Sequence, residues 1–477
     1  MYVKLKKLLL EGVRENAAED FLKQSIEGTE WYSKVYAVGG YVRDQLRKAD
    51  PKDLDLMIDK QNGGIEFAIW ITKKIGNYKE ESNPVTYNRF NTAKFNLNGV
   101  VHNGIDLSGF EIESVMPRSE EYTAGSRKPD VEFTSLKGDA LRRDTTFNSL
   151  FKNISTGEIL DLTGKGINDL EKGIIRTPID PDKTFKDDAL RMLRVCRFYV
   201  KYDFDIPLNI IRAMKRNASN IRNISSERIQ DELNKMLVTG APHRAIKLLK
   251  ITGILDHVMP EFKDSYQMTQ NQHHKHTVFK HSLDVLSKTQ PDLVQRLMGL
   301  FHDIGKVVTK SVTPTGVHFY GHEDEGEKMT RSIMFRLKYP TELINAVATG
   351  VKNHMRLKHG GDDAVALTDK TLRKFKMELG DNLENTLSLI HADNISHSEA
   401  SSMPNQIENV KNRLNNLNIP TTTKPTLPIN GKDLIDMGIK PGPIFTKIMT
   451  AVTDKWFENP NITKDEALEI AKNIAGK

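Results

Sequence analysis

Two aspartates near the start of the chain have the residue type and the spacing of a metal site. Asp53 and Asp55 lie in a strand-like run, where alternate residues share one face, so their carboxylates project together. Neighbouring carboxylates repel each other unless a cation lies between them, and Mg²⁺ is commonly held by one or two carboxylates plus substrate phosphates. Gly39, Gly40 and Arg43 predict a phosphate-binding turn just ahead of this pair. The combination favours nucleotidyl transfer.

A third carboxylate could complete this site. Glu111 and Glu113 share one face of a later strand-like segment, so either is eligible on geometry alone. In two-metal chemistry the ions activate a hydroxyl nucleophile and stabilise the leaving pyrophosphate. An isolated Asp-x-Asp pair is more often a pair of solvated edge-strand charges, but the adjacent turn with Arg43 favours the catalytic interpretation.

The second half of the chain contains another set of potential metal ligands, in the order His…His-Asp…Asp. This order resembles the HD phosphohydrolase superfamily, in which some members have extra histidine ligands. Imidazoles with carboxylates suit a divalent transition metal such as Mn, Ni or Fe. Such a centre hydrolyses phosphoesters, although HD-like domains also persist as inactive scaffolds, and both alternatives stay open. The main candidates are His281, His302, Asp303 and Asp393, and the extra ones are His322 and His354.

The composition limits the kind of protein that this chain forms. A length of 477 residues is enough for two to four domains. The mean hydropathy of −0.48 and the short apolar runs predict a cytoplasmic protein with no membrane partner. Cys196 is the single cysteine, which excludes an internal disulfide and a cysteine-based zinc site. The net charge of +6 is compatible with an RNA partner, and the oligomeric state stays open.

Strand-like and helical patterns predict an α/β head, with a mixed sheet and helices of the nucleotidyltransferase type, followed by a mostly α-helical remainder. A helix is predicted at 1–27, strand-like runs recur between 35 and 115, and helical periodicity dominates from about 139. Turn residues predict a mobile loop at 59–89 and a linker at 415–428. The predicted parts are a head at 1–150, a neck at 151–265, an HD-like body at 266–415 and a tail at 416–477.

Five ordered motifs resemble those of class II tRNA nucleotidyltransferases, the CCA-adding enzymes, and of the related bacterial poly(A) polymerases. The matching segments are Gly39–Asp55, Arg142–Leu150, Asp161–Leu170, Asp187–Phe198 and Ser226–Glu232. The resemblance implies Mg²⁺ held by the two aspartates, with Glu113 rather than Glu111 as the third carboxylate. It also implies tRNA, CTP and ATP as partners.

The segment 184–201 is predicted to be one helix that reads a nucleotide base. Asp188, Arg191 and Arg194 fall at i, i+3 and i+6, and an apolar face lies opposite. Cytosine and adenine present an amino donor beside a ring-nitrogen acceptor, whereas uracil and guanine present the reverse. Because Asp only accepts and Arg only donates, Asp188 with Arg191 fits C or A. The alternative is a solvated stripe with ordinary ion pairs.

The resemblance implies that further arginines hold the triphosphate and that Asp144, with Arg143, approaches the ribose. Asn148 is expected to hold the backbone. Arg228 is expected to form a structural salt bridge, with a role as a nucleotide ligand as the alternative. The predicted nucleotide-binding residues are Gly39, Gly40, Arg43, Arg143, Asp144, Asp188, Arg191, Arg194 and Arg197.

The implied activity is template-independent addition of CMP and AMP from CTP and ATP to tRNA 3′ ends. A poly(A) polymerase, or an enzyme that adds only CC or only A, is the alternative within the same class. An HD phosphohydrolase with a vestigial head is the alternative from another class.

Overall fold

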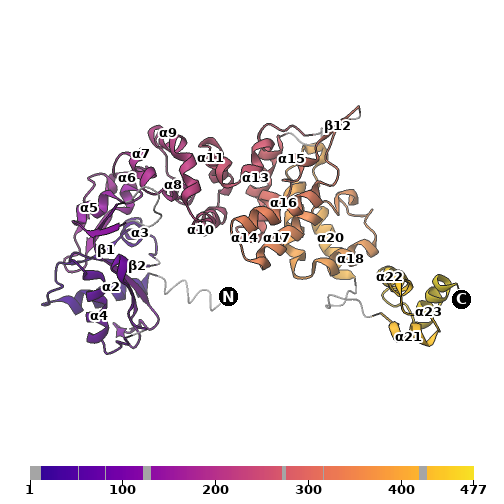
Figure 1. Ribbon diagram of the computed structural model, residues 1–477, viewed down its shortest axis with the longest axis horizontal. Helices are drawn as coiled ribbons and strands as arrows, with labels where there is room; N and C mark the ends of the chain where they lie inside the picture. Colours follow the sequence, from indigo (N-terminus) through magenta and orange to yellow (C-terminus); the bar gives the residue numbers. More distant parts are fainter. Residues whose placement is uncertain are drawn as a thin grey trace. The chain divides into compact units, whose positions relative to one another are not determined.

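The computed structural model describes residues 12–51, 53–80, 82–121, 130–270, 276–314, 316–417 and 427–476 (Figure 1). The chain divides into two compact units, one made of 1–236 and 248–258, the other of 237–247 and 259–477. The helix predicted at 1–27 is α2 (Val13–Ile26), and the residues before 12 lie outside the described part. The four-part division of the chain stays a prediction. Among the described residues, no helix has the length and apolar character needed to cross a membrane.

The head of the first unit is built on a seven-stranded mixed sheet. Strands β2 (Leu54–Ile58) and β7 (Glu111–Val115) pair in parallel, and the other neighbouring pairs are antiparallel. Two short hairpins, β5 (Val101–His102) with β6 (Ile105–Asp106) and β8 (Arg118–Glu121) with β9 (Asp130–Phe133), lie outside this sheet. In spatial order the strands are β11 (Ile159–Asp161), β10 (Leu150–Asn153), β1 (Val35–Val38), β2 (Leu54–Ile58), β7 (Glu111–Val115), β4 (Thr92–Asn96) and β3 (Val85–Tyr87).

Helix α4 (Gly63–Lys74) covers the face of the sheet that does not carry the acidic residues. Ser114 is the register partner of Leu56, and its hydroxyl donates to the carbonyl of Gly64 at 2.7 Å. The predicted loop at 59–89 is therefore wrong for residues 63–74. A Cβ at Gly64 would lie 2.3 Å from a backbone oxygen, so glycine here allows close helix–sheet packing. Phe67, fully buried, fixes the helix against the core.

The predicted helix at 184–201 is two helices, α7 (Pro181–Asp187) and α8 (Leu190–Tyr202). Asp188 has extended backbone angles, φ −146° and ψ 106°. Its Oδ1 accepts from the backbone N–H of Leu190 at 3.0 Å, which satisfies a free donor at the start of α8. A short acidic side chain competes in this way with the helix backbone, and here it ends the helix. The other helices of the first unit are α3 (Gly40–Leu46), α5 (Leu136–Leu141), α6 (Gly166–Lys172), α9 (Leu208–Asn217), α10 (Ser226–Leu237) and α12 (Leu255–Val258), with α11 (Pro242–Ile251) divided between the units.

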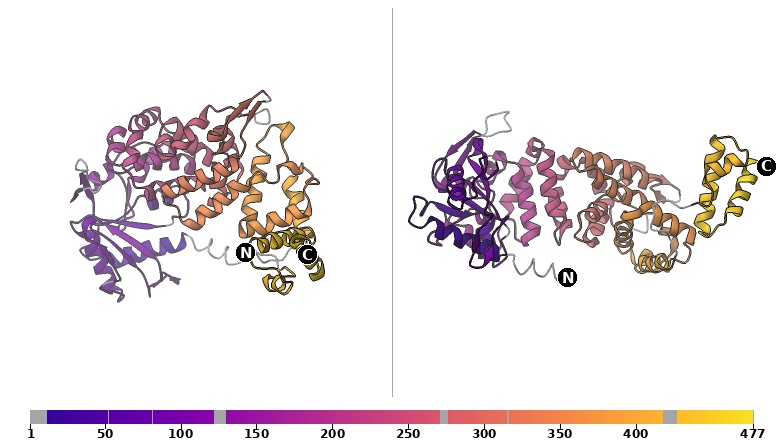
Figure 2. Two further views of the ribbon diagram at one scale, coloured as in Figure 1. Left: turned by 45° about the vertical axis from the view of Figure 1, so that its right-hand side comes forward. Right: turned by 90° about the horizontal axis from the view of Figure 1, so that it is seen from below.

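The second unit is mostly helical, with one short hairpin, β12 (Ser311–Thr313) and β13 (Gly316–His318) (Figure 2). The helices that pack against one another are α13 (Val278–Lys288), α14 (Leu293–Phe301), α16 (His322–Arg336), α17 (Thr341–Asn353) and α19 (Leu383–Asn394). Helices α21 (Gly431–Asp436), α22 (Pro443–Glu458) and α23 (Lys464–Ala475) share an apolar cluster that includes Ile448, Val452 and Trp456, and Met377 of α18 (Asp369–Leu379) belongs to it as well. Residues 418–426 of the predicted linker lie outside the described part. The helices are α13 (Val278–Lys288), α14 (Leu293–Phe301), α15 (Lys306–Thr309), α16 (His322–Arg336), α17 (Thr341–Asn353), α18 (Asp369–Leu379), α19 (Leu383–Asn394), α20 (Gln406–Asn416), α21 (Gly431–Asp436), α22 (Pro443–Glu458) and α23 (Lys464–Ala475).

Candidate nucleotide and metal sites

Three carboxylates share one face of the sheet. Asp55 lies opposite Glu113 in the parallel pair of β2 and β7, and Asp53 precedes Asp55 by two residues. Asp55 is open to solvent, yet the protein atoms around it exclude part of its hydration. This burial raises the pKa of Asp55 to about 6, and repulsion from Glu113 and Asp53 adds to the shift. Because burial and mutual repulsion make the ionised carboxylates unfavourable, a cation bound among them would stabilise them.

The donor chemistry of this cluster fits Mg²⁺. All three groups offer carboxylate oxygens, the ligands that hard divalent cations prefer. Lys94 is the register partner of Glu113, and its Nζ lies 3.9 Å from that carboxylate and 3.0 Å from Glu111. Glu111 therefore has a closer cationic partner, whereas Glu113 faces Asp55.

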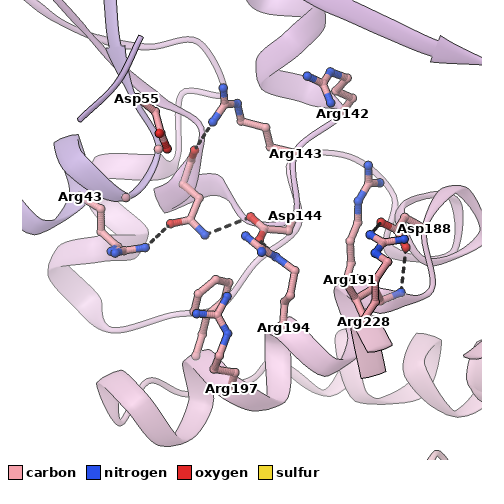
Figure 3. A pocket seen from close by; sticks show the side chains of 15 residues that line it. Arg43, Asp55, Arg142, Arg143, Asp144, Asp188, Arg191, Arg194, Arg197 and Arg228 are labelled. Atoms are coloured by element: carbon pink, nitrogen blue, oxygen red, sulfur yellow. Dashed lines mark hydrogen bonds and ion pairs between the residues drawn. The ribbon is translucent and has the colours of Figure 1, made fainter. Parts of the chain in front are cut away.

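A pocket of about 440 Å³ lies beside Asp55 and is lined by seven arginines. Figure 3 shows Asp55 on one side of it, Asp188, Arg191 and Arg228 on the other, and Arg194 in between. Such a concentration of guanidinium groups fits a polyanion such as a triphosphate. The lining residues are Gly39, Gly40, Arg43, Asp55, Arg142, Arg143, Asp144, Asn148, Asp188, Leu190, Arg191, Arg194, Arg197, Phe198 and Arg228. The pocket lining includes every predicted nucleotide-binding residue.

The glycine turn leaves room for the arginines. Gly39 has φ 67° and ψ −122°, a conformation that side chains rarely adopt, and a Cβ there would lie 3.2 Å from Nη1 of Arg143. Arg43 donates to both carboxylate oxygens of Asp44, at 2.8 and 2.6 Å. It also donates to Oδ1 of Asn148 at 2.7 Å, so Asn148 positions this arginine.

Asp139 joins two arginines of the pocket, and sequence reasoning missed it. This carboxylate is fully buried. It accepts from Nε and Nη2 of Arg142 at 3.0 and 2.5 Å, and from Nε of Arg143 at 2.9 Å. The sequence signal for this role is that Asp139 precedes Arg142 by three residues and Arg143 by four, because residues three and four apart on a helix are neighbours.

Two further carboxylates hold the arginines of α8. Asp144 accepts from Nε of Arg194 at 2.5 Å, and Glu232 accepts from Nε of Arg197 at 2.7 Å. Burial alone would raise the pKa of Asp144, but Arg194 and the hydrogen bond from Asn148 hold it well below its usual range. Asp144 is therefore a fixed anion that orients Arg194. Glu232 is the last residue of the motif Ser226–Glu232, but the sequence alone does not mark it as a site residue.

At the other end of the pocket, the predicted base-reading pair is held by its neighbours. Oδ2 of Asp188 accepts from Nη2 of Arg228 at 2.8 Å. Arg191 is buried, and its Nη1 donates to the carbonyl of Thr184 at 3.0 Å. Arg228 forms the predicted salt bridge and also lines the pocket. Because Asp188 lies before α8, its approach to Arg191 comes from the break in the helix and not from a shared helical stripe.

In the second unit, six buried side chains form two potential metal-binding triads. One is His281, His302 and Asp393, and the other is Asp303, His322 and His354. Within each triad the potential ligand atoms all lie within 4.8 Å of one another. His322 and His354, which the sequence ranked as extra candidates, thus form a triad with Asp303. Asp303 faces both triads, because its Oδ2 lies 3.3 Å from Nε2 of His302 and its Oδ1 lies 3.5 Å from Nε2 of His322.

The hydrogen bonds of three histidines prepare them as ligands. Nδ1 of His302, His322 and His354 each lies within hydrogen-bonding distance of a carbonyl three residues earlier, at 3.0, 2.8 and 2.6 Å. A donating Nδ1–H leaves each Nε2 with a lone pair, the tautomer that metal ligation requires. Nε2 of His302 is buried and makes no hydrogen bond to any described residue. Nε2 of His322 and of His354 lie 3.3 Å apart, a repulsive arrangement that a shared cation would relieve.

The electrostatics of the triads fit this interpretation. Burial lowers the pKa of His322 to about 4, so its imidazole is neutral at pH 7. Burial would raise the pKa of Asp303, but His302 and Lys306 hold it well below its usual range. The centre thus combines imidazoles with ionised carboxylates, a donor set that suits divalent transition metals.

Three models of known protein families match successive segments of the chain. Residues 35–176 match a model described as "Poly A polymerase head domain", residues 203–266 "Probable RNA and SrmB- binding site of polymerase A", and residues 322–471 "tRNA nucleotidyltransferase domain 2 putative". The tRNA nucleotidyltransferase cca1 of Schizosaccharomyces pombe is 36% identical over 236 residues, which are 46% of this chain and 44% of that protein. The CC-adding tRNA nucleotidyltransferase of Thermus thermophilus is 26% identical over 91% of this chain and 92% of its own.

The crystal structure of the Bacillus stearothermophilus CCA-adding enzyme in complex with CTP has the same fold, with a TM-score of 0.63 and 20% identity over 97% of this chain and 98% of that one. Residues 35–176, 203–266 and 322–471 are thus similar to domains of poly(A) polymerases and tRNA nucleotidyltransferases, and the fold is that of CCA-adding enzymes. This confirms the resemblance and the predicted fold class. The chain spans less than half the length of the yeast relatives that it matches, 44% for S. pombe cca1 and 40% for the mitochondrial enzyme of Saccharomyces cerevisiae.

Proposed function

We propose that this protein adds CMP and AMP from CTP and ATP to the 3′ ends of tRNA without a nucleic-acid template. The observation that carries the proposal is the arrangement of one pocket, in which a carboxylate-lined metal site, a group of arginines and a base-reading pair follow one another. The names of the relatives, which include tRNA nucleotidyltransferases and a CC-adding enzyme, support the same substrate. We also propose that the protein is cytoplasmic.

Asp53, Asp55 and Glu113 are the residues that would hold Mg²⁺, which when bound activates the RNA 3′-hydroxyl and stabilises the leaving pyrophosphate. The arginines bind the triphosphate and fix its orientation. Asp139, Asp144 and Glu232 keep these guanidinium groups in place before the nucleotide arrives, so less ordering remains when it binds. The triphosphate-binding arginines are Arg43, Arg143, Arg194 and Arg197.

Asp188 and Arg191 select the base by the polarity of their hydrogen bonds. Asp188 accepts from the amino group of C or A, and Arg191 donates to the adjacent ring nitrogen. Uracil or guanine would place a carbonyl against the carboxylate and an N–H against the guanidinium. Arg228 and the N–H of Leu190 orient Asp188, so the pair is rigid before the base arrives.

The decisive experiment gives the purified protein a labelled tRNA that lacks CCA, with CTP, ATP, UTP or GTP alone and with CTP plus ATP. Completion of CCA with CTP plus ATP supports the proposal. Addition of only C, only A, or a long A tail identifies the partial-adding or poly(A) alternative. No addition under any condition contradicts the nucleotidyl-transfer proposal.

A second candidate function is phosphoester hydrolysis at the two triads of the second unit. The observation that favours it is the pairing of His322 and His354 with Asp303, which completes six buried ligands around two positions. A divalent transition metal, Mn, Ni or Fe, is proposed there. Metal analysis of the purified protein and hydrolysis of a model phosphodiester, with and without His302→Ala, test it. Hydrolysis without nucleotide addition would identify a phosphohydrolase with a vestigial head.

A further inference from the structure

Two lysines accompany the two aspartates of the triads. Nζ of Lys306 lies 2.7 Å from Oδ2 of Asp303, and Nζ of Lys358 lies 2.7 Å from Oδ2 of Asp393. Both side chains are largely buried, with 6% and 16% of their surface exposed. Because both ammonium groups are buried and lie 2.7 Å from potential metal ligands, the two lysines belong to the same centre as the triads.

The lysines cancel the charge of the two carboxylates. The aspartates bring two negative charges, and the lysines paired with them bring two positive charges. The nearby Glu323 lies on the far side of the His322 ring, with its carboxylate 3.4 Å from Nδ1. Two divalent ions entering this buried site would add four positive charges while the carboxylates are already paired with lysines, which is costly in a region of low dielectric.

One lysine also competes directly for a ligand atom. The oxygen of Asp303 that contacts Lys306 is the same Oδ2 that lies 3.3 Å from Nε2 of His302 and 3.6 Å from Nε2 of His281. A metal ion bound in the first triad would use this oxygen and repel the ammonium. The displaced charge then needs a new anionic partner close by.

The lysines retain donors for such a partner. An ammonium has three N–H groups. Within the described part of the chain, Lys306 donates to Asp303 and Gln270, and Lys358 donates to Asp393 and Asn394. Each therefore has one further donor, and loses its carboxylate partner when metal binds there.

We propose that divalent metal and a phosphate dianion bind to this centre cooperatively, with Lys306 and Lys358 as the groups that couple them. Without phosphate, the lysines act as internal counter-cations and weaken metal binding. With phosphate, they bind the anion, and the charge of the metal ions is compensated. The proposal rests on the metal centre put forward under the second candidate function, and it adds that a doubly charged phosphate group is the ligand recognised.

The test measures Mn²⁺ affinity of the metal-stripped full-length protein, from free Mn²⁺ by electron paramagnetic resonance, with and without saturating inorganic phosphate. The Asp53→Ala/Asp55→Ala background removes the Mn²⁺ site of the head, and His302→Ala in that background reports binding elsewhere. Phosphate should raise the affinity of the triads on the order of tenfold or more. By the same linkage, Mn²⁺ should raise the affinity for phosphate equally.

Lys358→Met should strengthen Mn²⁺ binding in the absence of phosphate and reduce the phosphate effect, whereas Lys358→Arg should retain it. Lys306→Met should act in the same direction, and Lys358→Met serves alone if that buried variant fails to fold. Lys288→Met is the matched control, because Lys288 also forms a partly buried pair, with Asp284 at 3.1 Å, and contacts no triad residue. Equal Mn²⁺ affinity with and without phosphate would overturn the coupling but leave the metal centre. No Mn²⁺ binding in either condition would overturn the centre itself.

Discussion

Replacing Asp139 by asparagine tests whether one buried carboxylate positions two arginines of the nucleotide pocket. Burial would raise the pKa of Asp139, but Arg143 and Arg142 hold it below its usual range, so the group is ionised at neutral pH. Asparagine has nearly the same shape, but one of its terminal groups is an amide that donates. In either orientation it therefore places a donor against one of the two guanidinium groups.

The expected loss can be estimated from these contacts. Breaking a buried ion pair costs about 3–5 kcal/mol, and a hydrogen bond to a charged group contributes about 1.5–3 kcal/mol. Arg142 and Arg143 keep 23% and 19% of their side-chain surface exposed, so they regain some hydration when released. We expect the free energy of unfolding to fall by about 2–3 kcal/mol. Because misplacing a substrate-positioning group by ~1 Å costs on the order of 100-fold, kcat/KM for CMP incorporation should fall by a similar factor.

The assay combines urea unfolding with single-nucleotide incorporation into tRNA that lacks CCA. Asp182→Asn is the matched control, because Asp182 also binds an arginine, Arg216, at 2.5 Å, but this pair lies largely in solvent. The control should change stability by less than about 1 kcal/mol and leave kcat/KM unchanged. An Asp139→Asn protein that is less stable but incorporates CMP at the wild-type kcat/KM would refute the positioning role.

Three further changes test the pocket. Asp55→Asn should abolish incorporation but not tRNA binding. Because the pKa of Asp55 is raised to about 6, the metal-free variant should also have a higher melting temperature than metal-free wild type at pH 8, and this gain should vanish as the pH falls through 6 towards 4. Equal melting temperatures at pH 8 would contradict the repulsion among the carboxylates. Arg191→Ala should reduce discrimination of C over U by roughly 5- to 150-fold, measured as the ratio of kcat/KM values, and an unchanged ratio would remove its base-reading role. Gly39→Ala should lower the free energy of unfolding by about 1–2 kcal/mol, measured by urea unfolding, because a φ of 67° is strained for alanine. It should also weaken CTP binding by crowding Arg143. An unaltered KM for CTP would argue against a role of this turn in nucleotide binding.

The sequence predicted features that depend on local periodicity. Asp53 and Asp55 share a face because strand alternation is a property of the backbone, whereas alternation left Glu111 and Glu113 equally eligible and only the family resemblance favoured Glu113, which the register places opposite Asp55. Features that depend on competition between local and tertiary forces were predicted less well. The break at Asp188 lies between two helix-forming segments, and it became apparent only with the capping bond to Leu190.

The division of the body ligands into two triads could not be read from the sequence either. The adjacency of His302 and Asp303 along the chain indicates one shared site, but adjacent residues of a helix end point in different directions. His302 groups with His281 and Asp393, whereas Asp303 groups with His322 and His354 through Oδ1 and also faces His302 through Oδ2. Asp139 and Glu232 were missed for a related reason, because a carboxylate that orients an arginine has no motif of its own.

The pairing of β7 limits where the chain tolerates insertions and deletions. β7 is held on both sides, by β2 in parallel and by β4 in antiparallel register, so that Glu113 lies between Asp55 and Lys94. Loss of one residue within β7 would turn Glu113 towards α4 and remove an acid from the cluster. Most of the connection at 97–110 is also fixed, because it contains the β5–β6 hairpin and the buried Leu97 and Leu107, but the hairpin turn at 103–104 can change in length, since pairing on both edges of β7 restores the register after it. Length variation among related chains should therefore collect at that turn and avoid residues 111–115.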